Sequence, residues 1–279
     1  MNKNVALVDS HAHLDHVDDL EGVLARAKDA GVSKIVTIGT SVESSKRAIE
    51  IAQQYSTNDL QIFATCGLHP KDAASDVHQN LLHYDNVLES IVLSSDKIVA
   101  IGECGLDYYL GSGGQGLGTS ENDKKFQGEL FGGQIELAAE LNLPLVVHCR
   151  NGWGEIFDLI SNIKNQRSKT RGVFHSWTGD WDAAKKAFDL GFYISFSGIV
   201  TFKNASEIQE VAKKAPIDRI LVETDSPFLT PEPHRHVINE PANVKMIAQF
   251  IAQLRNQPFD KIAEATTRNA ESIFRIKSM

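Results

Sequence analysis

VALVDSHAHLD, residues 5–15, joins a short apolar run to a polar segment with two histidines. Residues 5–8 are all apolar rather than alternating with polar ones, which is typical of a strand buried on both faces, as the strands of parallel sheets are. Seven more runs of this kind follow. They begin at Lys34 (KIVTIGT), Gln61 (QIFATCG), Lys97 (KIVAIGE), Leu143 (LPLVVHC), Gly172 (GVFHS), Phe192 (FYISFSG) and Arg219 (RILVETD).

Segments with helical patterning separate these runs. The clearest are residues 19–30, 42–55, 124–141, 180–190, 243–255 and 258–276. Eight strand–helix units in 279 residues favour a closed (β/α)8 TIM barrel, which typically needs about 250 residues, over an open doubly wound sheet. We therefore expect one α/β domain over residues 1–279.

The segment GSGGQGLGTSEND, residues 111–123, interrupts this alternation. It contains five glycines and one large apolar residue, Leu117. This composition predicts a flexible surface loop. The loop is either a lid over a site or an insertion that the barrel tolerates, and the composition favours an insertion.

Composition restricts the classes of function. The net charge of −8, from 28 basic and 36 acidic residues, is opposite in sign to the broad basic face of a protein that coats duplex nucleic acid. Action on a nucleic acid end remains possible, because bound cations and a few local arginines or lysines can hold one or two phosphates. Without a secretion signal or an apolar run near the roughly 18 residues of a membrane span, we expect a cytoplasmic protein. Nothing indicates a membrane or an obligate protein partner.

Residues that can bind metal stand where the predicted strands end. His11 and His13 are two positions apart, so in extended backbone their side chains leave the same face. Four other runs end in such a residue, namely Glu103, His148, His175 and Asp225. Each one alone fits a core histidine or an ion-paired carboxylate. The carboxyl ends of barrel strands converge on one rim, however, and six such residues there indicate a metal site.

The donor types suggest which ions bind. Imidazoles with carboxylates suit Zn, Mn, Fe or Ni better than Mg. Six ligands exceed the roughly three that one catalytic zinc takes from protein. We expect two divalent ions per chain (Zn, Mn or Mg), zinc being the first choice, with Glu103 between them. The second histidine pair, His234 and His236, lies in a proline-flanked loop that does not fix the rings, and we do not expect it to bind metal.

Several short blocks coincide with these strand ends. They are DSHAHLD from Asp9, CGLHP from Cys66, GECGLDYY from Gly102, LPLVVHCR from Leu143, FHSWTG from Phe174 and ETDSPFL from Glu223. Together they resemble the TatD-like metal-dependent deoxyribonucleases, in order and spacing, over essentially the whole chain. The resemblance implies a barrel of the metal-dependent hydrolase (amidohydrolase) type, the same six metal ligands and activity on DNA, commonly as an exonuclease.

The chain departs from the family pattern at three places. The glycine-rich segment is longer, Ser176 and Trp177 replace a frequent Cys-Phe pair, and RHVINEP from Arg235 replaces the usual Arg-Gly pair. These departures bear on the substrate rather than on the chemistry.

A mechanism follows as a hypothesis. His11, His13 and Asp225 hold one ion, His148 and His175 hold the other, and Glu103 bridges them. Water bound to such ions ionises near pH 7 and attacks phosphorus, so that the nucleophile is a metal-bound hydroxide, and Asp225 accepts its proton. Glu103 and Asp225 are thus the predicted catalytic residues.

Four further residues are candidates for contact with the substrate, which we expect to be DNA ends or single strands. Arg150 and Arg235 can clamp a phosphate, because guanidinium matches two phosphoryl oxygens at once. Both are also explained as surface arginines. His69 can contact the substrate from the third strand end, and Trp177 either stacks on a base or packs in the core.

Two other functions share these residues. The same site can hydrolyse an ester or amide, as in deacylation of aminoacyl-tRNA. A non-catalytic binding protein with a structural metal is a third interpretation, but such a protein usually lacks a ligand, and none of the six is missing here.

Overall fold

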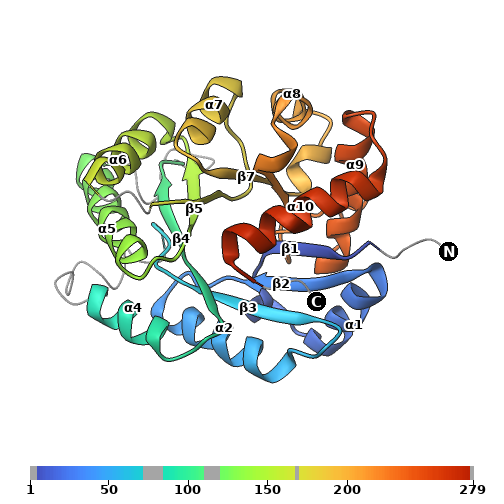
Figure 1. Ribbon diagram of the computed structural model, residues 1–279, viewed down its shortest axis with the longest axis horizontal. Helices are drawn as coiled ribbons and strands as arrows, with labels where there is room; N and C mark the ends of the chain where they lie inside the picture. The colour runs from blue at the N-terminus through green and yellow to red at the C-terminus, as the bar shows by residue number, and fades with distance from the viewer. Residues whose placement is uncertain (1–4, 72–83, 110–119, 167–169, 277–279) are drawn as a thin grey trace.

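In a computed structural model, which describes residues 5–71, 84–109, 120–166 and 170–276, eight parallel strands form a barrel surrounded by helices (Figure 1). The strands are β1 (Leu7–Ala12), β2 (Val32–Thr37), β3 (Gln61–Cys66), β4 (Ile98–Asp107), β5 (Leu145–Arg150), β6 (Gly172–Phe174), β7 (Tyr193–Phe196) and β8 (Ile220–Val222). Each pairs in parallel with the next, in sequence order. All eight predicted strands and the predicted (β/α)8 TIM barrel are confirmed.

The barrel closes between β1 and the segment after β8. The backbone N–H of Asp225 donates to the carbonyl of His11 (2.9 Å), and that of His13 donates to the carbonyl of Ser226 (2.7 Å). The buried carboxylate of Asp9 accepts hydrogen bonds from the backbone N–H (2.9 Å) and the hydroxyl (2.6 Å) of Thr224. The closure therefore joins the two segments that carry His11, His13 and Asp225.

The helices of the described residues lie outside the strands, around the sheet and across one end of the barrel (Figure 1). They are α1 (Leu20–Ala30), α2 (Val42–Tyr55), α4 (Tyr84–Leu93), α5 (Glu121–Glu140), α6 (Trp153–Gln166), α7 (Trp181–Asp189), α8 (Ser206–Lys214), α9 (Val244–Leu254) and α10 (Phe259–Phe274). Local capping sets both ends of α1. The side chain of Asp19 accepts a hydrogen bond from the first turn of this helix, and Gly31 ends it with φ +97°. Among the described residues, no helix has the length and apolar character needed to cross a membrane.

Helix α5 begins earlier than the sequence pattern predicts. The hydroxyl of Ser120 accepts from the backbone N–H of Asp123, and the carboxylate of Asp123 accepts from the backbone N–H of Ser120. This capping box starts the helix at Glu121. Residues 121–123, which we predicted to be part of the glycine-rich loop, are thus helical. Residues 111–119 of that loop lie outside the described residues.

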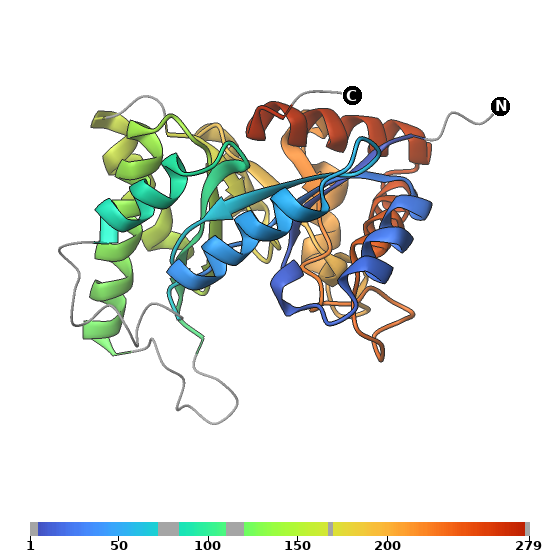
Figure 2. The same cartoon turned by 90° about the horizontal axis from the view of Figure 1, so that it is seen from below.

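The end of the barrel where the strands begin is closed. Side chains inside the barrel, among them Val36, Val146 and Leu221, pack against Ile273 and Phe274 of α10. Figure 2 shows α10 lying across this end. Hydrogen bonds from α10 reinforce the closure, because Asn269 donates to the carbonyl of Ile220 and Thr267 donates to that of Ala6, and the buried Lys34 pairs with Glu271 at 2.8 Å. A site that admits substrate must therefore lie at the other end.

Candidate metal centre

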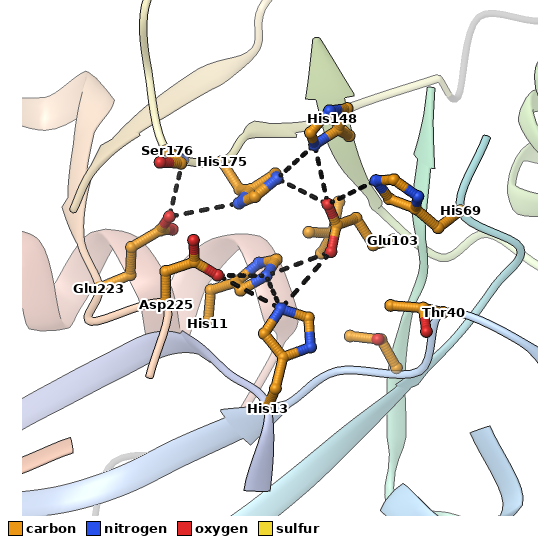
Figure 3. Close-up of polar contacts among 12 residues, drawn as sticks. His11, His13, Thr40, His69, Glu103, His148, His175, Ser176, Glu223 and Asp225 are labelled. Atoms are coloured by element: carbon orange, nitrogen blue, oxygen red, sulfur yellow. Dashed lines mark hydrogen bonds and ion pairs between the residues drawn. The ribbon is translucent and has the colours of Figure 1, made fainter. Parts of the chain in front are cut away.

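All six predicted ligands meet at the end of the barrel where the strands finish (Figure 3). His11 lies in β1 and His13 follows it, Glu103 lies in β4, His148 lies in β5, His175 follows β6, and Asp225 follows β8. The two-residue spacing of His11 and His13 brings both rings to the same side of the strand, as predicted.

One group of donors gathers around the two histidines of the first strand. The Nε2 atoms of His11 and His13 lie 3.3 Å apart. Oδ1 of Asp225 is 3.6 Å from Nε2 of His11 and 3.2 Å from that of His13. Oε2 of Glu103 completes the group, 3.4 Å from Nε2 of His11 and 3.8 Å from that of His13.

A second group forms at the other oxygen of Glu103. Oε1 lies 2.8 Å from Nε2 of His175 and 2.9 Å from Nδ1 of His148, and these two nitrogens are 3.1 Å apart. The two oxygens of one carboxylate thus face two separate sets of nitrogen donors. This is the arrangement expected of a carboxylate that bridges two ions.

The donor atoms fit divalent metal. Ligand atoms about 2.0 to 2.2 Å from a tetrahedral zinc ion lie roughly 3.3 to 3.6 Å from one another. The contacts of the first group, 3.2 to 3.8 Å, are close to that separation, and every atom in it is a nitrogen or a carboxylate oxygen. The first group and His175 are buried and His148 is partly buried, so their lone pairs require a cation or protons. The clusters can therefore bind metal.

The electrostatics of the cluster also favour positive charge. Burial alone would raise the pKa of Glu103, but His175 beside it and the contacts with His11 and His148 hold that pKa well below its ordinary value. Burial opposes protonation of His175, yet Glu103 and Glu223 together raise its pKa well above the usual one. The carboxylates thus make this pocket attractive to cations.

Two carboxylates that we did not single out from the sequence lie beside the outer nitrogens of two rings. Oδ2 of Asp107 is 3.3 Å from Nε2 of His148, and Oε1 of Glu223 is 3.4 Å from Nδ1 of His175. Glu223 also accepts a hydrogen bond from the backbone N–H of Ser176 at 2.7 Å. Such partners orient metal-binding imidazoles.

The even spacing that pairs His11 with His13 could have found both carboxylates. Asp107 lies four positions after Glu103 and Glu223 two before Asp225. In an extended strand, residues separated by an even number share a face.

His69, a predicted substrate contact, lies beside the second group. Its Nε2 atom is 3.6 Å from Oε1 of Glu103, and its Nδ1 atom accepts a hydrogen bond from the backbone N–H of Lys71. Burial lowers the pKa of His69 to about 3, so its ring is neutral. His69, Asp107 and His148 bring their ligand atoms within 4.8 Å of one another.

A cavity of about 420 Å³ opens at the centre, and its walls include His148, His175, Asp225, Arg150 and Phe228. Arg150 is exposed there, and its guanidinium lies 3.5 Å from the centre of the Tyr109 ring.

The other two predicted substrate contacts lie elsewhere. Arg235 is exposed, lies over the ring of Phe202 (3.6 Å), and is not among the described residues that line this cavity. Trp177 is only 1% exposed and packs against Trp153, with ring centres 4.5 Å apart. No face of its ring is open to a base, so the packing alternative applies and the stacking prediction is wrong.

The second histidine pair lies at the surface. His234 and His236 are both exposed. Neither belongs to a cluster of potential metal ligands within the described part of the chain.

A parallel eight-stranded barrel with histidines and carboxylates clustered at its open end defines the class of metal-dependent barrel hydrolases. A family model described as TatD related DNase matches residues 8–275. The chain therefore belongs to the family of TatD-related DNases, and it is a metal-dependent hydrolase of the TatD type.

Individual relatives match along their full length. The uncharacterized metal-dependent hydrolase YabD of Bacillus subtilis (strain 168) is 39% identical, with 97% of this chain and 99% of YabD covered. The uncharacterized metal-dependent hydrolase YcfH of Escherichia coli (strain K12) is 37% identical, with 97% and 96% covered. The crystal structure of YjjV, a TatD homologue from Escherichia coli K12, has a TM-score of 0.84 and 26% identity, with 99% of this chain and 100% of that chain covered.

Proposed function

We propose that this chain is a deoxyribonuclease that hydrolyses phosphodiester bonds at DNA ends or in single strands with two divalent ions. The observation that carries the proposal is the placement of Glu103, whose two carboxylate oxygens face separate groups of imidazole nitrogens. Paired ions suit in-line displacement at phosphorus, because they stabilise both the attacking and the leaving oxygen. Membership in a family described as TatD related DNase supports DNA as the substrate.

The six clustered residues would bind the two ions in two sets. His11, His13 and Asp225 would hold one, and His148 and His175 would hold the other, with Glu103 placed between the two groups of donors. When bound, the ions, which we propose to be zinc or manganese, supply Lewis acidity at the phosphoryl group and lower the pKa of nearby water. Asp107 and Glu223 keep the rings of His148 and His175 oriented toward Glu103.

Other side chains bind the substrate and move the proton. Asp225 lines the cavity, so its carboxylate can accept the proton that the attacking water loses. Arg150 lines the same cavity and binds a phosphoryl group as a charged donor. His69, beside Glu103, contacts the substrate from the end of β3. Arg235 lies outside the cavity lining and contacts a more distant part of the strand.

The experiment is digestion of end-labelled single- and double-stranded DNA by the purified protein, with its metal content measured. We expect labelled DNA to be shortened, and we expect chelation followed by dialysis to abolish the reaction. Full turnover by the metal-free protein would contradict the proposal. A parallel panel of aryl esters and aminoacyl-tRNA tests the rival ester or amide hydrolase, and turnover of those substrates without cleavage of DNA would refute the nuclease.

A further inference from the structure

Phe228 is a large apolar side chain that stands 49% exposed beside the metal centre. It lines the same cavity as Asp225 and His175. Its ring centre lies 5.7 Å from that of His13 and 5.9 Å from that of His16. Exposure of an aromatic ring to water is unfavourable. A ring in the wall of this cavity is positioned to be covered by an aromatic or apolar group of the substrate.

The loop that carries Phe228 is anchored on both sides. The backbone N–H of Phe228 donates to the carbonyl of Asp225 at 2.9 Å. The side-chain amide of the buried Asn239 donates to the carbonyl of Phe228 (2.6 Å) and to that of Thr224 (2.8 Å). The ring is therefore presented from a backbone that is already ordered, which reduces the entropy lost when a ligand binds.

The chemistry of the cavity matches a nucleotide. Its described lining combines the cation of Arg150 with the apolar side chains of Phe228, Leu229 and Ile199. Its volume, about 420 Å³, lies within the range of roughly 300 to 1,000 Å³ typical of small-molecule sites. A phosphate attached to a flat aromatic group would satisfy both the charge and the apolar surface.

Other aromatic side chains near the cavity are less suitable for stacking. Trp177 is buried. Trp153 lines the cavity but is only partly exposed, and its ring packs on those of Phe157, Phe174 and Trp177. Among the ring contacts of the described residues, Phe228 makes only T-shaped contacts with two histidine rings, so more of its surface is open.

We propose that Phe228 forms a base-stacking subsite, in which its ring stacks on a nucleobase next to the scissile phosphate. This inference rests on the proposed nuclease function and deepens it: the site recognises a nucleoside rather than a phosphodiester alone. Stacking on an aromatic side chain tolerates any base, because every base has a π-face. The subsite therefore gives preference for nucleic acid over simple phosphodiesters without preference for a sequence.

The test is a double-mutant cycle, in which Phe228 is changed in the enzyme and one base is removed from the substrate. The metal-loaded enzyme is given thymidylyl-thymidine and its two counterparts in which one thymine is replaced by hydrogen, and kcat and KM are measured by chromatography of the products. For the wild type, we expect removal of the stacked base to lower kcat/KM about tenfold or more, mainly through KM. For the Phe228→Ala enzyme, we expect kcat/KM for the intact dinucleotide to be lowered by the same factor. Removal of the stacked base should then lower kcat/KM no further.

Two further variants sharpen the interpretation. Phe228→Tyr keeps an aromatic ring and should keep the preference. Leu93→Ala is the matched control, because Leu93 is 70% exposed at the end of α4 and is not among the described residues that line the cavity. It should behave as the wild type. Metal content is measured for each variant, so that a loss of ions is not mistaken for a loss of stacking.

The outcomes separate the two proposals. A Phe228→Ala enzyme that slows equally on all three dinucleotides, or on none, would overturn the subsite. Wild-type enzyme that cleaves DNA but turns over the base-free dinucleotides as well as thymidylyl-thymidine would overturn the subsite and leave the nuclease standing. Wild-type enzyme that cleaves neither labelled DNA nor any dinucleotide would refute the nuclease, and the subsite with it.

Discussion

The Nε2 atoms of His11 and His13 lie 3.3 Å apart, so both rings present a nitrogen to the same point in the cluster. Their two-residue spacing in extended backbone produces this convergence, and the bonds that close the barrel hold Asp225 against them. Two imidazole nitrogens this close, with a carboxylate beside them, are best satisfied by a shared cation.

Replacing both histidines with alanine should remove bound metal and lower turnover by more than about 100-fold, because changes in residues that merely orient ligands already cost about 10- to 100-fold. Metal analysis, DNA digestion and circular dichroism measure the three effects, and the spectrum should remain that of a folded barrel. The His234→Ala and His236→Ala double variant is the control, since it removes an exposed pair of the same spacing. Equal losses in both double variants would contradict the assignment.

Glu223→Gln should weaken metal binding or turnover by about 10- to 100-fold while the fold is retained. The change keeps the size of the side chain but removes the charge that faces Nδ1 of His175. Metal titration and steady-state kinetics provide the measurement. Glu264→Gln, which alters an exposed carboxylate paired with Arg268, should change neither. An unaltered Glu223→Gln enzyme would show that this carboxylate does not orient the ring.

Gln134→Leu should lower the free energy of unfolding by about 1 to 3 kcal/mol. The buried amide of Gln134 in α5 accepts from the backbone N–H of Leu68 (2.8 Å) and donates to its carbonyl (3.1 Å), so leucine leaves both groups without these partners. Denaturant unfolding measures the loss. The exposed Gln249 supplies the control, since Gln249→Leu should stay within about 0.5 kcal/mol of the wild type. A Gln134→Leu protein as stable as that control would disprove the expectation.

Arg150→Ala should raise KM for DNA about tenfold or more, because hydrogen bonds to charged groups are worth about 1.5 to 3 kcal/mol. Arg150 lines the cavity, whereas Arg235 lies over Phe202 and is not among the described residues of that lining. Arg235→Ala should therefore have the smaller effect in the same assay. The reverse order of effects would mean that substrate approaches from the Arg235 side.

The three cysteines should be unreactive in the native protein. Cys66, Cys104 and Cys149 are free and buried. Burial raises the pKa of Cys66 to about 12, so at pH 8 the thiol stays protonated and lacks the reactive thiolate form. A thiol-reactive disulfide should label no cysteine in the native protein and three after denaturation. Rapid labelling before denaturation would show that a thiol is accessible.

Individual residues show which features of the fold and the site the sequence predicts and which it does not. The apolar runs predicted all eight strands, because burial on both faces of a parallel sheet is visible in consecutive residues. The start of α5 was predicted three residues late, because the Ser120–Asp123 capping box is a short local signal within a polar segment. Asp107 and Glu223 were not predicted to belong to the site, although their even spacing from Glu103 and Asp225 indicates a shared face.

By itself, the sequence determined the alternation of strands and helices and the kinds of donor at the strand ends, since both depend on neighbouring residues. Only the tertiary structure decided that the two oxygens of Glu103 face different imidazoles, that Trp177 is buried, and that Phe228 is exposed in the cavity. The physical reason is barrel closure: contacts between β1 and the segment after β8 join residues more than 200 positions apart, and no local pattern records which way their side chains then point.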